Sequence, residues 1–317
     1  MRIALLALLL AGCAADAATP TWTLIPGGFD AGRQPDGNSV LIDAPQGLIL
    51  VDTGRHAAHQ AKILAAARGA GKPVAAIVNT HWHLDHSGGN AEIRAAFPGI
   101  PLYASRAVEG ALDGFLADSR RDALAYIASG KADAATEAEI RADIAASEDR
   151  GALVPDHPVE ASGESAIAGR TIDLRLARNA ATAGDVWLYL PEDHTVIVGD
   201  IVTLPVPFLD TASAGGWLAA LDHVAATPFE TLIPGHGPAM DRAAFARWHG
   251  AFRNLVACAD GEASDGDCAA GWRRDLGPLL PAADANRADR MIAYYLTARL
   301  RPGSPGRAKP EARPAKD

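Results

Sequence analysis

The sequence predicts an α/β sandwich, in which stacked sheets carry helices and the loops at the strand ends carry the chemistry. Two observations lead to this fold class. Between residues 47 and 104, apolar strand-like runs alternate with helical segments in the order β-α-β-α-β. After residue 170, short β-rich runs return, and two of them are joined by a tight turn, which is typical of a hairpin within one sheet of such a sandwich.

The first half of the chain begins with short β-rich runs between residues 22 and 51, separated by Gly and Pro turns. The run at 47–51 is apolar and ends in the polar turn Asp52-Thr53-Gly54, so it is predicted to be a buried strand. The other elements of this half are predicted as helices at 57–70 and 92–97 and strands at 74–79 and 102–104.

Between about residues 105 and 150 the composition shifts to Ala, Asp, Glu and Arg, which predicts two or three amphipathic helices inserted into the domain. This insertion is interpreted either as a lid or as simple packing. The second half continues with predicted strands at 171–176, 186–190, 195–199 and 231–233, a helix at 217–226 and further helices to about residue 300.

We expect a single domain over residues 21–300, because 317 residues with 49% hydrophobic content suffice for a sizeable core. Residues 301–317 combine prolines with Lys, Arg, Gly and Ala, a composition typical of a disordered tail. The net charge of −9 and the pI near 5.5 argue against a nucleic-acid binder, whose footprint would be basic. We therefore expect no nucleic-acid partner, and the motifs described below indicate a small-molecule substrate instead.

Residues 1–17 are predicted to be a secretory signal peptide, because one arginine is followed by an apolar run too short to span a bilayer. Two cleavage routes remain open. Leu10-Ala11-Gly12-Cys13 is similar to a bacterial lipobox, and its use would make Cys13 the lipid-anchored first residue. Ala15-Asp16-Ala17 offers ordinary cleavage, after which Cys13 leaves with the leader. Either route predicts an exported, periplasmic protein, and the first one a membrane-anchored lipoprotein.

Cys258 and Cys268 remain after either cleavage. In an oxidising compartment two cysteines at this spacing favour a disulfide that closes a short loop, and two unpaired surface thiols are the alternative. We do not interpret either one as a metal ligand.

The segment His81-Trp82-His83-Leu84-Asp85-His86 follows the apolar run 74–78 and holds four possible metal-binding side chains. In an extended backbone, alternate residues point to one face, so His81, His83 and Asp85 would converge while a turn brings His86 round. Imidazole and carboxylate groups together suit zinc and neighbouring divalent ions. A histidine-rich surface turn is the alternative, and the strand before and the glycine-rich turn after the cluster argue against it.

Three more polar residues terminate predicted apolar strands: Asp52, Asp200 and His236. Residues at strand ends can share one edge of a sandwich although they are far apart in sequence, so these side chains are candidates to join the histidine cluster. The alternatives are a helix cap or solvated turn for Asp200 and an ordinary turn histidine for His236.

These motifs together resemble the metallo-β-lactamase superfamily over about residues 22–240. The resemblance implies an αβ/βα four-layer sandwich with a metal site, often of two zinc ions, at the edge between the sheets. By position it implies first-metal ligands His81 and His83, second-metal ligands Asp85, His86 and His236, a bridging Asp200, and Asp52 as the residue that orients a ligand histidine.

One position departs from the superfamily pattern, which has a further first-metal histidine about twenty residues before the bridging aspartate. The chain has Ala181 there, and a methyl group cannot bind metal. Waters, Asn179, His56 or His157 are the candidates to complete the first site. We expect one firmly held zinc ion on Asp85, His86, His236 and Asp200, and a depleted first site.

The resemblance implies a metal-dependent hydrolase of an ester, thioester, lactone or amide. A bound ion lowers the pKa of its coordinated water to about 7, and Asp85 or Asp200 would then accept the proton and return it to the leaving group. His81 and His83 would serve as oxyanion donors if they are not ligands. Trp82 and the run 201–208 either line an apolar substrate pocket or pack in the core.

Three other functions remain open: a β-lactamase, a metal-binding or interaction protein whose catalysis has decayed, and a mononuclear iron oxygenase acting on thiols or persulfides. The iron site would use His81, His83 and Asp200. The absent histidine at 181 argues against iron, because related iron sites use that position too. Loss of activity on changing Asp200 would separate an enzyme from a decayed one.

Overall fold

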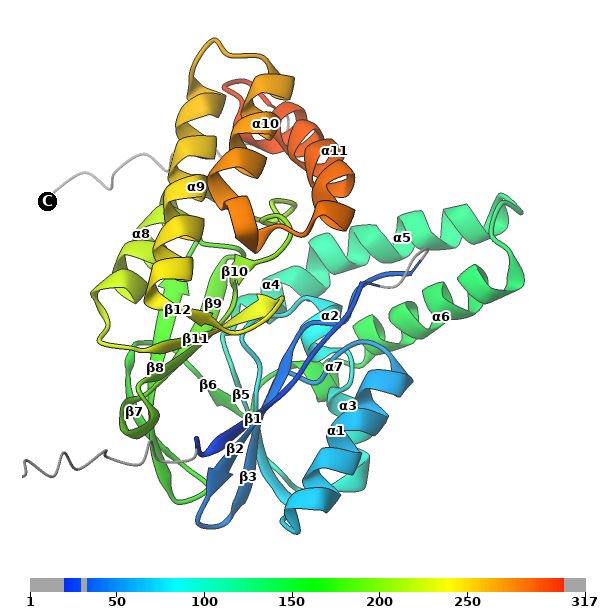
Figure 1. Cartoon of the computed structure of the whole chain (residues 1–317). Helices are drawn as coiled ribbons and strands as arrows, with labels where there is room; N and C mark the ends of the chain where they lie inside the picture. Colours follow the sequence, from blue (N-terminus) through cyan, green and yellow to red (C-terminus); the bar gives the residue numbers. More distant parts are fainter. Residues whose placement is uncertain (1–19, 30–32, 305–317) are drawn as a thin grey trace, which may run out of the picture.

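The computed structural model describes residues 20–29 and 33–304. The predicted signal peptide, with its Cys13, and residues 305–317 of the predicted tail lie outside the described residues. The described strands form two six-stranded sheets that pack face to face, with helices on both outer sides (Figure 1). The predicted αβ/βα sandwich is therefore confirmed.

The first sheet has the strand order β1-β2-β3-β4-β5-β6. Its strands pair antiparallel from β1 to β3 and parallel from β3 to β6. They are β1 Trp22–Ile25, β2 Ser39–Ala44, β3 Gly47–Val51, β4 Val74–Val78, β5 Leu102–Ala104 and β6 His157–Pro158. Helices α1 (Ala57–Ala70) and α3 (Asn90–Ala96) cover the outer face of this sheet.

The second sheet has the order β12-β11-β10-β9-β8-β7. Its strands are β7 Gly163–Ile167, β8 Arg170–Arg178, β9 Gly184–Leu190, β10 Thr195–Thr203, β11 Thr231–His236 and β12 Met240–Asp241. Only β10 and β11 pair in parallel, and helix α8 (Ala214–Ala226) makes the crossover between them. The predicted hairpin of β9 and β10 is present, with the short 3-10 helix Pro191–Asp193 in its turn.

Alternation along the strands explains why the layers stack as they do. In β3, Leu48 and Leu50 pack toward the helices on the outer face, whereas Ile49 and Val51 pack between the two sheets. Because successive strand residues point to opposite faces, a continuously apolar strand can serve two cores at once. The buried strand that the apolar run 47–51 predicts therefore lies in the middle of the molecule.

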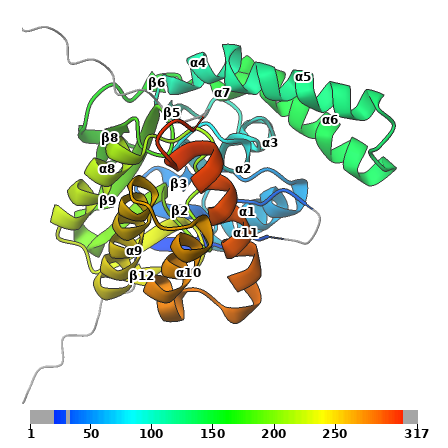
Figure 2. The same ribbon diagram turned by 90° about the horizontal axis from the view of Figure 1, so that it is seen from above.

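The insertion forms helices α4 (Ala107–Asp113), α5 (Phe115–Ala128), α6 (Ala134–Glu148) and α7 (Arg150–Leu153). The hairpin of α5 and α6 projects away from the sheets in both views (Figure 1 and Figure 2). Its outer part is thinly packed, since Leu124 and Tyr126 are 48% and 43% exposed.

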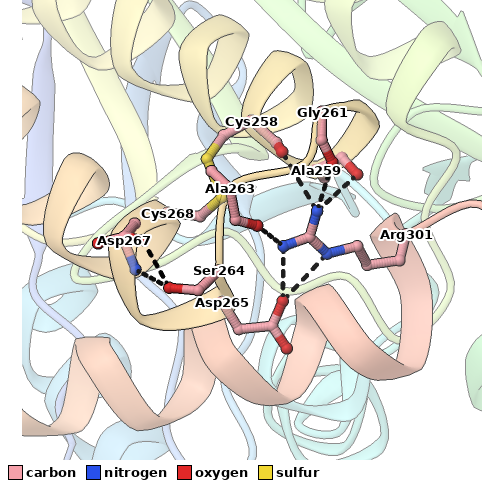
Figure 3. Close-up of a disulfide and its surroundings, with 9 residues drawn as sticks. All are labelled: Cys258, Ala259, Gly261, Ala263, Ser264, Asp265, Asp267, Cys268 and Arg301. Carbon is pink, nitrogen blue, oxygen red and sulfur yellow. Dashed lines mark hydrogen bonds and ion pairs between the residues drawn. A yellow bond between two sulfur atoms is a disulfide. The ribbon is translucent and has the colours of Figure 1, made fainter.

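The C-terminal helices α9 (Arg242–Asp260), α10 (Asp265–Leu276) and α11 (Ala285–Tyr295) stand together beyond the second sheet (Figure 1). Cys258 and Cys268 form a disulfide that ties α9 to α10, beside a guanidinium group that bridges the same turn (Figure 3). Arg301 donates to the carbonyls of Ala259 (3.2 Å) and Gly261 (2.9 Å) and to Asp265 Oδ1 (2.9 Å). Contacts therefore continue through Arg301, where the tail was predicted to begin. Within the described residues, no helix combines the length and apolar character needed to cross a membrane.

Candidate metal centre

All six candidate ligands come together at one edge of the sandwich. They lie in the loop after β4, in the short helix α2 (Leu84–Ser87), in β10 and at the end of β11. The ligands form two groups, and within each group the ligand atoms all lie within 4.8 Å of one another. These groups are His81, His83 and Asp200, called the first group here, and Asp85, His86 and His236, called the second group.

The extended backbone predicted for the histidine cluster is wrong in its second half. The chain turns into α2 at Leu84, so Asp85 and His86 project from a helix and Asp85 does not share a face with His81 and His83. The backbone N–H of His86 donates to the carbonyl of His83 at 3.0 Å, which closes this turn. The grouping implied by the family resemblance, rather than the strand periodicity, is the one present.

Asp200 lies within β10 and not at its end, because the strand continues through an irregularity. The pairing of β10 with β11 shifts register around Gly199, whose φ is 53°. A Cβ at Gly199 would meet Thr80 Oγ1 at 2.5 Å, and a Cβ at Gly235 would meet Asp200 Oδ1 at 2.1 Å. Only glycine suits either position, and the bulge turns Asp200 toward the histidines.

The Asp200 carboxylate lies between the two groups. Its Oδ1 is 3.1 Å from His86 Nε2 and 3.6 Å from His236 Nε2, and its Oδ2 is 3.7 Å from His81 Nε2. His236 Nε2 also lies 3.1 Å from Asp85 Oδ2. All these side chains are buried.

Hydrogen bonds around Asp52 determine which nitrogen of two histidines carries a proton. His86 Nδ1 lies 2.8 Å from Asp52 Oδ2 and donates there, so in the neutral ring, which is the form that binds a metal, Nε2 keeps the lone pair. Thr80 Oγ1 donates to Asp52 Oδ2 at 2.7 Å and must therefore accept from His81 Nδ1, 3.0 Å away. The lone pairs of both rings consequently face Asp200, which is the orientation that a ligand histidine requires.

Several buried polar atoms of this edge lack a hydrogen-bond partner among the described residues: His81 Nε2 and both carboxylate oxygens of Asp200. Buried polar groups are normally paired, and unpaired acceptors that converge suit a cation. Imidazole and carboxylate donors together fit zinc or a similar divalent ion, so the residues fit the metal that the fold implies.

The electrostatic environment agrees with this donor set. Burial, assisted by the charge of His86, holds the pKa of His81 well below its usual value, and burial also lowers the pKa of His83. Burial alone would lower the pKa of His86 too, but the surrounding carboxylates of Asp200, Asp52 and Asp85 raise it well above normal. The buried carboxylates thus attract positive charge to this edge.

Arg55 was not identified from the sequence. Its Nη1 donates to Asp143 Oδ2 on α6 at 2.6 Å, and its Nη2 lies 3.9 Å from Asp85 Oδ1. The inserted helices therefore contact the surroundings of the second group through one arginine.

A pocket of about 470 Å³ opens beside His236. The rings of Phe29 and Phe208 lie 5.0 and 5.2 Å from the His236 ring. Most of its lining is apolar and comes from the segment after β10, from β12 and α9, and from the turns before α11, including Leu204, Pro205, Met240, Ala244 and Leu279. Its cation, Arg287, lies over the Phe29 ring at 4.6 Å and pairs with Asp284 at 2.7 Å.

Of the residues predicted to line an apolar pocket, some line it and others are buried in the core. Leu204 and Pro205, from the run 201–208, line the pocket, whereas Ile201 and Val202 are fully buried in the core. Trp82 is 6% exposed and packs against Phe115, with ring centres 5.5 Å apart. Trp82 is therefore a packing residue.

Residues 32–236 match the sequence profile of the Metallo-beta-lactamase superfamily. The chain belongs to the metallo-β-lactamase superfamily. The match covers the whole stretch that carries both groups of candidate ligands.

Two curated proteins are similar to this superfamily member. A linear primary-alkylsulfatase from a Pseudomonas species (strain ATCC 19151) is 27% identical over 218 residues, which are 62% of this chain and 40% of the alkylsulfatase. A hydroxyacylglutathione hydrolase from Gloeobacter violaceus is 52% identical over 44 residues, or 14% of this chain and 18% of that protein. The chain thus spans less than half the length of either relative.

Solved structures of the superfamily share the fold. A metallo-β-lactamase family protein from Thermus thermophilus superimposes with a TM-score of 0.57 at 16% identity, covering 87% of this chain and 93% of that one. A metallo-β-lactamase from Pontibacter korlensis gives a TM-score of 0.51 at 19% identity, covering 72% and 92%. At these identities the likeness concerns the fold alone.

Ala181, where the family resemblance implies a further histidine, is fully buried in the core of the second sheet. None of the three suggested side chains supplies a buried ligand there. Asn179 is exposed before β9, His56 Nδ1 bonds Asp36 at 2.9 Å, and His157 stacks on Tyr103 at the edge of the first sheet. The structure instead places the hydroxyl of Thr211 3.0 Å from His83 Nε2.

Sequence reasoning missed Thr211 because it lies 128 residues after His83, in a loop without a recognisable motif. Only the threonine-rich surroundings of Asp200 hint that hydroxyl groups are available near the site.

Proposed function

We propose that this chain is an exported zinc-dependent hydrolase of esters that carry a linear apolar group. The observation that carries the proposal is the convergence of unpaired, buried nitrogen and carboxylate atoms of His81 and Asp200 in a ligand cluster whose His236 also lines an apolar pocket. Superfamily membership supports hydrolysis, and the pocket supports the substrate class.

The second group together with Asp200 would hold the firmly bound zinc ion, and the first group would hold a second ion more weakly. Histidine and carboxylate ligands suit zinc, and two histidines with a shared carboxylate form an incomplete set. When bound, the metal would polarise the scissile group and provide hydroxide at neutral pH. Asp52 would orient His86 directly and His81 through Thr80, since its carboxylate receives hydrogen bonds from both His86 and Thr80.

The protein side chains would then bind the substrate and transfer the proton. Asp85 and Asp200 are the buried acids closest to His236, and we assign to them acceptance of the proton and its return to the leaving group. His236 forms one end of the pocket, so a substrate whose reacting group reaches it would lay its apolar part on Leu204, Met240 and Leu279.

The similarity to a linear primary-alkylsulfatase supports an ester with an apolar chain. The matched region covers only 40% of that protein. The volume of about 470 Å³ lies within the range of small-molecule sites, so a medium-length chain would fit it.

Hydrolysis of alkyl sulfates and of 4-nitrophenyl alkanoates by the zinc-loaded protein tests this function. Asp200→Ala should lower kcat/KM at least about a hundredfold, because it removes a buried carboxylate from the centre of both groups. Asp222→Ala, an exposed acid on α8, is the matched control and should keep full activity. Equal activity of the Asp200 variant and the unaltered protein would contradict the role assigned to Asp200 and favour the decayed, metal-binding function.

Export is part of the proposal and rests on the leader at 1–17. The intact mass of the protein recovered from a bacterial envelope fraction distinguishes a lipidated Cys13 from cleavage after Ala17. A full-length chain in the cytosol would contradict export.

A further inference from the structure

We propose that Thr211 and Tyr295 are positioning residues of the candidate metal centre, by which helix α11 fixes the side chain of His83. The inference rests on the proposed metal site, and it assigns a role to the C-terminal helices that lie outside the matched superfamily region. The juxtaposition is a chain of contacts from Tyr295 through Asp210 and Thr211 to His83.

The first step concerns the single proton of the Thr211 hydroxyl. Thr211 Oγ1 lies 3.0 Å from the carbonyl oxygen of Ala181, which can only accept, so the hydroxyl donates there. The same oxygen lies 3.0 Å from His83 Nε2 and must accept from it. His83 is thereby held as the Nε2–H tautomer, and its Nδ1 keeps the free lone pair.

The second step concerns what fixes Thr211. The neighbouring Asp210 accepts a hydrogen bond from the Tyr295 hydroxyl through Oδ2 at 2.8 Å, and Arg299 Nη2 lies 4.0 Å from its Oδ1. Tyr295 is only 3% exposed. Burial and the nearby Asp210 raise the pKa of Tyr295, so the phenol stays protonated and donates. On the other side of Thr211, the N–H of Ser213 donates to the Ala180 carbonyl at 2.9 Å.

These contacts fasten the loop on both sides of Thr211 and place its hydroxyl against a candidate ligand. The first group has only two histidines and a shared carboxylate, so the orientation of each ring matters more than in a complete site. Hydrogen bonds to the far nitrogen of a ligand histidine fix its tautomer and commonly change metal affinity about 10–100-fold.

Two readouts test the inference. The first is the tautomer of His83 in metal-free protein, from long-range ¹H–¹⁵N spectra of histidine-labelled samples assigned with His83→Gln. The second is the affinity of the weaker of two zinc-binding events, measured by calorimetric titration. Thr211→Val removes the hydroxyl at nearly constant shape, Thr211→Ser retains it, and Tyr295→Phe removes only the anchor. Tyr294→Phe, at an exposed neighbour, is the matched control.

We expect the Nε2–H tautomer in the unaltered, Thr211→Ser and Tyr294→Phe proteins and its loss in Thr211→Val. The affinity of the weaker zinc-binding event should fall about 10–100-fold in Thr211→Val, and by a smaller factor in Tyr295→Phe. An unchanged His83 tautomer in Thr211→Val would overturn the inference. An unchanged affinity of the weaker zinc-binding event in that variant would overturn it too. If the unaltered protein binds no zinc at all, the proposed function fails, and the spectra still decide whether Thr211 positions His83.

Discussion

Asp52 connects the two groups of candidate ligands at the scale of single residues. Its side chain accepts from His86 Nδ1 and from the hydroxyl and backbone N–H of Thr80, at 2.7 to 2.8 Å. Its backbone has a φ of 58°, which few residues other than glycine adopt. Backbone strain of this kind is often found where a side chain must be aimed.

Asp52→Asn should weaken binding of zinc about 10–100-fold. The amide keeps the shape, but it loses the charge and brings an N–H group against donors that need an acceptor. Calorimetric titration of the metal-free protein measures the change. Asp43→Asn, an exposed acid on β2, is the control and should bind zinc like the unaltered chain. Unchanged affinity in the Asp52 variant would mean that this carboxylate does not orient the histidines.

The buried side chain of Asp185 makes the free energy of unfolding depend on pH. It is buried and receives hydrogen bonds from Thr182, and burial raises its pKa from 3.8 to about 7. Between these values the folded state keeps a proton that the unfolded chain releases. Stability from this group therefore falls as pH rises across the window, by up to about 1.4 kcal/mol per pH unit.

Urea unfolding of metal-free protein between about pH 5 and 8 checks this sign. Asp185→Asn should remove the contribution, so its free energy of unfolding should depend less steeply on pH than that of the unaltered chain. Asp222→Asn should keep the original dependence. Parallel curves for the unaltered and Asp185 proteins would refute a raised pKa.

The sequence motifs predicted most of the candidate site at this scale, since spacing and strand ends identify all six candidate ligands. Thr211 and Arg55 could not be found in this way. Each acts through a contact between segments far apart in the chain, and neither belongs to a local pattern.

At the scale of elements, helix α9 contributes one wall of the pocket through Ala244. Ala244 lines the cavity on this helix, whereas Ala246 lies on its exposed side. A larger side chain at 244 would therefore fill space that we assign to the substrate chain.

Ala244→Leu should shorten the preferred alkyl chain by about three carbons, the difference between the two side chains, with kcat/KM falling about fourfold per methylene that no longer fits. Hydrolysis rates across a series of chain lengths measure this shift. Ala246→Leu makes the same change on the exposed face and should keep the original profile. Identical profiles for both variants would place the substrate elsewhere.

Most elements could be predicted from periodicity: the helix at 57–70 and the strands at 47–51 and 102–104 agree with the structure residue for residue. The short strands β6, β7 and β12 were missed, and so were two local features of the candidate site. Helix α2 is too short for a periodic signal, and the continuation of β10 past Gly199 depends on a bulge that only the neighbouring strand and Thr80 explain.

At the scale of the whole molecule, three apolar layers hold the candidate site in place. One lies between the sheets and one between each sheet and its helices. Alternating strands and helices predict this stacking, because each buried strand supplies two cores. The path of the C-terminal helices was not predictable from local sequence, and it is these helices that complete the pocket and reach Asp210.

Zinc content per chain tests the central claim most directly. Protein purified without chelator and dialysed against zinc-free buffer should retain about one zinc ion, rising toward about two in Ala181→His, where a third histidine would join the first group. A His86→Ala, His236→Ala double variant provides the background. Zinc in the unaltered chain no higher than in that double variant would contradict the metal centre.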